Sequence, residues 1–224
     1  MRLFSCAALL GLFIFSCGTV RAQSPAPVPV QDEPRHKPVL RNTQVMILRI
    51  QIPPSDESLM HTHENDAVHI TIQGSEVRET TPRGWWASNH AASADGLTYF
   101  SALGGKTYTH QIRNTGSRDT DIVSVELLGS APANPRALSE SPGAEQIAYN
   151  ARTRVERLRS NSTVDVPPSL ANAILVSLRA GTLSGLEAAT AMSPGSVHWI
   201  PAGTAVRAEA SPGSGNELIY LRLR

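Results

Sequence analysis

The sequence has little cysteine, little aromatic character and no strong charge bias. Its only two cysteines, Cys6 and Cys17, lie near the start, so no disulfide can join the rest of the chain. Aromatic residues make up 5% of the 224 residues, which offers no evident platform for stacking bases or sugars. Basic residues number 20 against 19 acidic ones, without a long basic run. This argues against a nucleic-acid partner and a polybasic membrane surface.

The first 22 residues have the pattern of a signal peptide. Arg2 precedes an apolar run over residues 3–15, which is shorter than the ~20 residues of a membrane-spanning helix. The residues before Gln23 favour cleavage after Ala22, so residues 1–22 are the predicted leader. A competing lipobox ends at Cys17 and would make that residue a lipid anchor. We expect a periplasmic or extracellular protein, with an outer-envelope lipoprotein as the alternative.

Beyond the leader the chain reads as a tether followed by short β-strands. Residues 23–38 contain five prolines and predict an extended, semi-rigid segment, because proline supports neither a helix nor a central strand. Short strands punctuated by glycine and proline predict a sandwich or a barrel. Alternating or β-branched runs mark strands at residues 45–52, 68–72, 121–128, 173–178 and 218–223.

The second half of the chain resembles a degenerate copy of the first. Residues 42–50 (NTQVMILRI) align with residues 150–158 (NARTRVERL). Residues 52–55 (IPPS) align with residues 166–169 (VPPS). Such internal duplication indicates two units of one fold.

Domain boundaries follow from this duplication and from a Pro-rich break. We expect a first lobe over residues 39–130, a linker over 131–147 and a degenerate second lobe over 148–224. A helix over residues 144–158 is the alternative that composition allows. The alignment with the first copy favours a strand there.

The stretch MHTHENDAVH, residues 60–69, carries the candidate chemistry. In an extended segment His61 and His63 point the same way, because side chains alternate with period two. His110 begins a His-x3-Asn pattern at the start of a later strand and is the candidate third ligand. Three imidazoles suit one divalent ion, here iron, manganese, zinc, copper or nickel.

His-x-His, a strand ending at Gly74 and a later His-x3-Asn resemble the two conserved motifs of the cupin superfamily. The first cupin motif has a glutamate four or five residues after its second histidine, where this sequence has Ala67 and Val68. Asp66 is therefore a candidate fourth ligand, or a residue that orients a ligand histidine. His69 is expected to face away from the metal or into solvent, unless a bulge rotates the strand.

Residues 195–206 resemble the second cupin motif, Gly-x5-Pro-x-Gly-x2-His. Gly195, Pro201 and Gly203 match, whereas Val206 stands in place of the histidine. The resemblance covers residues 39–224. It implies an all-β fold, a double-stranded β-helix in two tandem copies, with a metal in the first copy alone.

Three further residues are candidates for contact with a bound small molecule. Tyr108 lies next to the third histidine, Trp86 would border the barrel mouth, and Glu126 lies on a predicted strand. Each has a plainer alternative. The Tyr108 hydroxyl could lie in solvent, Trp86 could pack a lid, and the Glu126 carboxylate could face water. The resemblance also implies a homodimer as one form of assembly.

Two classes of function fit this sequence. One is a metal-dependent enzyme of the oxygenase or isomerase kind acting on a small molecule, with open positions on the metal. The other is a non-catalytic envelope protein that holds a small ligand or a metal. A fourth ligand from Asp66 or His69 would close the site and favour holding. An open position facing a cavity would favour an enzyme.

Overall fold

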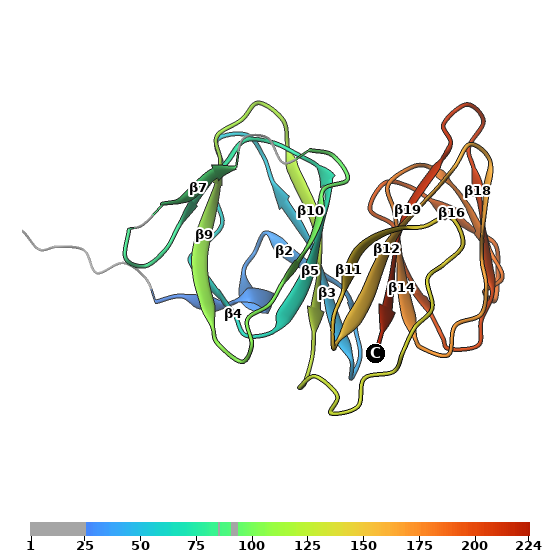
Figure 1. Ribbon diagram of the computed structural model, residues 1–224. Coiled ribbons are helices and arrows are strands. Elements are labelled where there is room, and N and C mark those ends of the chain that lie inside the picture. The colour runs from blue at the N-terminus through green and yellow to red at the C-terminus, as the bar shows by residue number, and fades with distance from the viewer. Residues whose placement is uncertain (1–25, 85, 91–93) are drawn as a thin grey trace, which may run out of the picture.

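The computed structural model shows two β-barrels, one after the other along the chain (Figure 1). It describes residues 26–84, 86–90 and 94–224, with only the backbone of 86–90. The predicted leader, its cleavage site and Cys17 lie outside these residues. Within the described part of the chain, no helix is long and apolar enough to cross a membrane. The prediction of an all-β fold is confirmed.

In its described residues the first barrel contains ten strands and one 3-10 turn, Val30–Asp32. Its strands are β1 (Val28–Pro29), β2 (His36–Arg41), β3 (Val45–Ile52), β4 (His61–His63), β5 (Asp66–Gln73), β6 (Val77–Thr80), β7 (Trp86–His90), β8 (Thr98–Ser101), β9 (Tyr108–Asn114) and β10 (Thr120–Leu127). They form two sheets, β2-β3-β10-β5-β8 and β1-β4-β9-β6-β7. The predicted strands at 45–52, 68–72 and 121–128 correspond to β3, β5 and β10.

The second barrel repeats this plan with nine strands. They are β11 (Glu145–Tyr149), β12 (Thr153–Ser160), β13 (Thr163–Val166), β14 (Ala173–Ser177), β15 (Gly181–Ser184), β16 (Thr190–Met192), β17 (Val197–Ile200), β18 (Val206–Ala210) and β19 (Asn216–Leu223). The sheets are β11-β12-β19-β14-β17 and β13-β18-β15-β16. Because β11 and β12 cover most of residues 144–158, the alternative of a helix there is wrong.

Two equivalent turns confirm the alignment of residues 42–50 with 150–158. The Asn42 side-chain oxygen accepts hydrogen bonds from the backbone N–H of Gln44 and Val45, at 2.8 and 3.0 Å. The Asn150 oxygen does the same for Arg152 and Thr153, at 2.8 and 3.1 Å. Each asparagine therefore closes the turn that leads into the long strand of its own barrel.

The second alignment, of residues 52–55 with 166–169, is wrong. Ile52 ends β3, whereas Val166 ends β13, which occupies the place of β4 in the second barrel. A Pro-Pro pair stops whichever strand precedes it, because proline lacks the N–H that a ladder needs. The pair therefore marks the end of a strand and does not identify the strand.

The two barrels share one apolar layer, here called the inter-barrel core. Outward-facing side chains of β3, β5 and β10 pack against those of β12, β14 and β19, which lie side by side in Figure 1. Because strand side chains alternate, Met46 and Leu48 of β3 point the other way, into the first barrel, where Val30 packs on them. The inter-barrel core contains Val45, Ile47, Val68, Ile70, Val123, Val125, Leu127, Val155, Ile174, Val176, Ile219, Leu221 and Leu223.

The tether predicted over residues 23–38 is wrong from Val28 onward. Val28–Pro29 pairs in parallel with β4, and β2 pairs with β3. Val30 and His36 are each only 2% exposed. Both added strands lie at sheet edges, where proline is tolerated because its missing N–H faces no neighbour. The segment therefore belongs to the first barrel.

The predicted linker over residues 131–147 is also shorter than expected. Strand β11 already begins at Glu145. Ser141 is buried, and its backbone N–H and hydroxyl donate to the fully buried Glu156 carboxylate at 3.0 and 2.8 Å. The end of the connection is therefore packed on the second barrel.

Candidate metal centre

The structure brings the three predicted histidines together inside the first barrel. His61 and His63 occupy the two ends of β4, and His61 lies directly opposite His110 on β9. All three are buried, with exposed fractions of 0%, 6% and 8%. One nitrogen from each ring can be chosen so that the three atoms lie within 4.8 Å of one another. Two facing strands thus place three imidazoles at one point.

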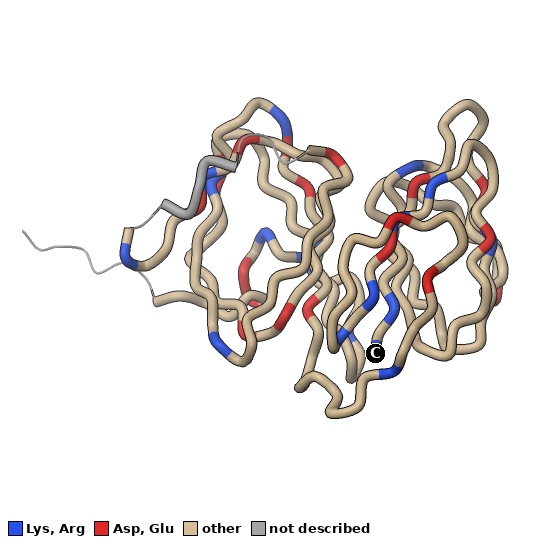
Figure 2. The backbone as a smooth tube through the Cα atoms, in the orientation of Figure 1, with Lys and Arg blue, Asp and Glu red and all other residues tan. Residues whose placement is uncertain are grey.

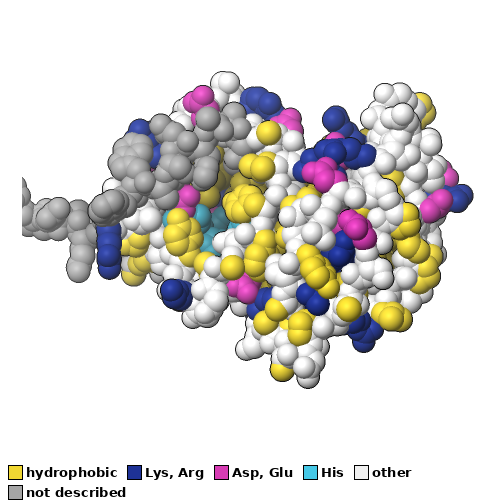
Figure 3. Space-filling view, viewed as in Figure 1, with side chains coloured by type: hydrophobic (Ala, Val, Ile, Leu, Met, Phe, Trp, Pro, Cys, Tyr) yellow, Lys and Arg dark blue, Asp and Glu magenta, His cyan; other side chains and the backbone are white. Residues whose placement is uncertain are grey.

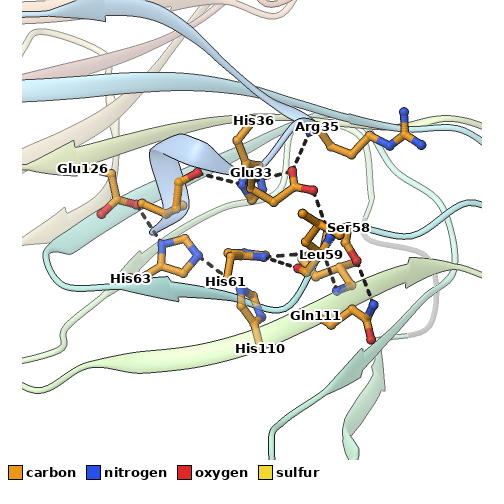
Figure 4. A network of polar contacts seen from close by, with 12 residues as sticks. Glu33, Arg35, His36, Ser58, Leu59, His61, His63, His110, Gln111 and Glu126 are labelled. Carbon is orange, nitrogen blue, oxygen red and sulfur yellow. Dashed lines mark hydrogen bonds and ion pairs between the residues drawn. The ribbon is translucent and has the colours of Figure 1, made fainter. Parts of the chain in front are cut away.

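Each of these rings is held in place through its Nδ1 atom, and Figure 4 shows the partners of His61 and His63. The partners are oxygens that accept, so Nδ1–H donates and Nε2 keeps a free lone pair. Such partners fix the ring orientation of metal-binding histidines. The contacts are His61 with the Leu59 carbonyl at 2.8 Å, His63 with Glu126 at 3.0 Å, and His110 with Glu79 at 2.6 Å.

The free Nε2 atoms fit a divalent metal. The Nε2 atoms of His63 and His110 lie 3.1 Å apart, although both carry lone pairs in this tautomer. The Nε2 of His61 is buried and has no hydrogen-bond partner among the described residues. Two facing lone pairs and one orphaned acceptor are unfavourable without a cation between them. A transition-metal ion that prefers imidazole would satisfy all three.

A cavity of about 510 Å³ lies against the three histidines. Tyr108 and His69 line it, and so do side chains from both sheets of the barrel. In the space-filling view, histidine side chains of the first barrel are visible beside hydrophobic side chains (Figure 3). A small molecule in this cavity would therefore lie next to the metal position.

The candidate substrate residues take different places. Tyr108, the candidate for contact with a small molecule, lines the cavity, and its hydroxyl donates to Glu79. Burial, together with Glu79, raises the pKa of Tyr108. Glu126 is fully buried behind His63, so it positions that ring and does not reach the cavity. The Trp86 side chain lies outside the described part of the structure.

Asp66 is not a metal ligand in this arrangement. Its Oδ1 accepts the backbone N–H groups of Leu103 and Gly104 at 2.7 and 3.1 Å. Its Oδ2 lies 3.6 Å from Arg152, which belongs to the second barrel. Because Ala67 lines the cavity, strand alternation turns Asp66 to the opposite face. The aspartate therefore fixes a loop and joins the barrels.

His69 faces the cavity, so the expectation that it points away from the metal side or into solvent is wrong. Its ring centroid lies 6.1 Å from that of His63 and 5.0 Å from that of Tyr99. His69 and Ala67 are two residues apart on β5 and share the inward face. Burial lowers the pKa of His69 to about 3, so its ring is neutral.

Two residues of the site were missed from the sequence. Glu79 lies in a short strand, and only the pairing of β6 with β9 brings it to His110. His36 lies in the proline-rich segment, with its ring centroid 4.5 Å from that of His61. Its Nδ1 donates to the Val30 carbonyl at 3.2 Å, and its Nε2 is buried without a described partner. The sequence offered one signal for His36, namely a histidine within a proline-rich segment.

The second barrel lacks an equivalent centre among its residues. Val166 and Val206 face each other across β13 and β18 as His61 and His110 do across β4 and β9. Both valines are buried in an apolar cluster that fills this barrel. In the second barrel, Val206 stands where the motif has a histidine, and the barrel interior is filled by apolar side chains.

Metal-free protein is expected to lose stability as the pH falls below 6.5. Burial lowers the pKa of His36 to about 3 and of His61 to about 2, whereas both titrate near 6.5 when unfolded. The unfolded chain therefore binds protons first as the pH falls. Stability is complete above pH 6.5 and falls by up to about 1.4 kcal/mol per pH unit for each of these histidines as the pH drops towards 3.

Urea denaturation of chelator-treated protein at pH 7.5 and pH 5.0 measures this effect. A His36→Asn variant should show a weaker pH dependence, because one of the rings with a lowered pKa is gone. Equal stability at both pH values would contradict neutral histidines in the fold.

No protein-family model and no curated protein matches the sequence. Solved structures do match. One is AerE from Microcystis aeruginosa, at 12% identity over 86% of this chain and 98% of that one, with a TM-score of 0.55. Another is a variant of salicylate 1,2-dioxygenase from Pseudoaminobacter salicylatoxidans with gentisate, at 12% identity over 88% and 76%, with a TM-score of 0.58.

A cupin 2 conserved barrel domain protein from Leptotrichia buccalis also matches, at 8% identity over 84% of this chain and 88% of that one, with a TM-score of 0.52. These likenesses span both barrels. The chain has the cupin fold, in two tandem copies, with a histidine triad in the first.

Proposed function

We propose that the first barrel holds one divalent transition-metal ion on His61, His63 and His110. We further propose that the protein is a metal-dependent enzyme acting on a small molecule in the adjacent cavity. The observation that carries this proposal is the position of three convergent imidazoles at the wall of a cavity of about 510 Å³. Three protein ligands leave metal positions open, as catalytic metals require.

The surroundings of the triad favour an enzyme over a metal-holding protein. Asp66 is committed to a loop, so it does not close the site as a fourth ligand. His69 faces the cavity but does not belong to the group of histidines whose ligand atoms converge. When bound, the metal would supply Lewis-acid or oxygen-activating chemistry. Glu79 and Glu126 would keep two of the rings oriented, while Tyr108 stands at the cavity wall. The likeness in fold to a salicylate 1,2-dioxygenase supports an oxygenase as the reaction class to test before an isomerase.

Export and self-association belong to the same proposal. The leader pattern of residues 1–22 supports a periplasmic or extracellular protein, with lipid attachment at Cys17 as the alternative. The cupin fold supports a homodimer. Mass spectrometry of the secreted chain and light scattering test these two points.

Metal content of the purified protein tests the proposed site. We expect about one equivalent of iron, manganese, zinc, copper or nickel in the wild type and essentially none in His61→Ala. His198→Ala is the matched control, because His198 lies on β17 of the second barrel. It should retain the metal. Equal metal content in wild type and His61→Ala would contradict the proposed centre.

A further inference from the structure

The wall of the cavity beside the triad is mainly apolar, and among the described residues Glu79 is its one carboxylate. Polar but uncharged side chains complete it, among them Thr71, Ser101 and Tyr99. No lysine or arginine lines it among the described residues, and residues 85–93 (WWASNHAAS) contain neither type. Basic positions elsewhere are interspersed with acidic ones over both barrels (Figure 2). The larger apolar side chains of the lining are Ile50, Val77, Leu97, Leu103, Ile112 and Ile122.

The carboxylates around the triad balance the charge of a divalent ion. Glu79 and Glu126 each hydrogen-bond a ligand histidine, and their side chains are only 14% and 0% exposed. Together they contribute a formal charge of −2 next to an ion of charge +2. Glu33 is buried 3.5 Å from His36 and adds a third carboxylate to this end of the barrel. The loaded centre therefore has no excess positive charge.

An anionic ligand would be poorly accommodated in such a cavity. A carboxylate that enters must give up its hydration, and it needs a cationic or hydrogen-bonded partner in return. Among the described residues no lysine or arginine lines this cavity, and the charge of the ion is already offset by Glu79 and Glu126. An uncharged ring with a hydroxyl or carbonyl oxygen loses far less on entry. The volume falls within the range of small-molecule sites.

We propose that the cavity selects an uncharged, largely apolar small molecule with a hydroxyl or carbonyl oxygen, and that it discriminates against carboxylates. This inference rests on the proposed metal centre. The proposed ligands differ in charge from those of the salicylate 1,2-dioxygenase of similar fold. That enzyme is named for one acid, salicylate, and its structure contains another, gentisate. Discrimination comes from the absence of a cationic partner rather than from cavity size.

The test uses salicylamide and salicylate, which share a ring and a hydroxyl and differ in charge at one substituent. Zinc-reconstituted protein is first assayed for metal content, then titrated with each compound at pH 7 by isothermal calorimetry. We expect salicylamide to bind at least about tenfold more tightly than salicylate. A Glu79→Gln variant with verified zinc content should narrow this ratio, because one negative charge is removed.

Equal or tighter binding of salicylate to zinc-loaded protein overturns the inference. Absence of binding by both compounds at millimolar concentration also overturns it. A wild-type protein that retains no zinc would instead contradict the proposed metal centre, so the two failures are distinguishable.

Discussion

Glu126→Gln is expected to weaken metal binding by about 10- to 100-fold, although Glu126 is not a ligand. The carboxylate accepts the Nδ1–H of His63 at 3.0 Å and is fully buried. A buried anion makes the imidazole a stronger donor to the metal and holds its orientation. Glutamine preserves the shape and an accepting oxygen but removes the charge. A loss of metal affinity would therefore come from the missing negative charge.

Competition with a calibrated chelator measures the affinity. Glu64→Gln is the matched control, because Glu64 directly follows the same histidine and is exposed. The control should bind metal like the wild type. If Glu126→Gln and Glu64→Gln behaved alike, Glu126 would have no role in positioning His63.

Val125→Asp is expected to prevent stable folding, with a loss of at least about 4 kcal/mol in the free energy of unfolding. Val125 is fully buried in the inter-barrel core, whose described members are all apolar and offer no partner for a new carboxylate. Val125→Ala removes volume without adding charge, and should cost about 2 kcal/mol.

Urea denaturation and soluble yield measure both variants. Val39→Asp is the control, because Val39 is 48% exposed on β2. It should change stability by no more than about 0.5 kcal/mol. If Val125→Asp were as stable as the control, the two barrels would not pack through this face in solution.

The inter-barrel core also explains why strand positions were predictable. The runs that became β3, β10 and β19 are rich in β-branched and aliphatic residues because one face packs between the barrels and the other fills a barrel interior. Such strands carry a strong local signal. The segment over residues 28–38 carries none, because its strands lie at sheet edges and contain proline.

The metal ligands could be predicted because two of them are two residues apart on one strand. Period-two alternation alone places His61 and His63 on the same face. His110 required the resemblance to a known motif, since its strand is distant in the sequence. The pairing of β4 with β9 then brought it opposite His61.

Residues that act through a neighbour could not be found in this way. Glu79, Glu126 and His36 reach the triad from three different strands, and none shares a short motif with it. Asp66 shows the reverse case. It lies next to the motif in sequence, yet alternation along β5 turns it toward a loop.

Local order along the chain therefore determined the strands, the duplication and the pair of histidines on β4, because these depend on residue spacing within one segment. Tertiary structure alone decided which carboxylates orient the histidines and which charges face the cavity. It also decided that residues 28–38 form edge strands of the first barrel. The carboxylate–histidine contacts, for example, join residues 31 and 63 positions apart in the sequence. They depend on how the strands pair, and a register set by sheet packing has no signature in any one segment.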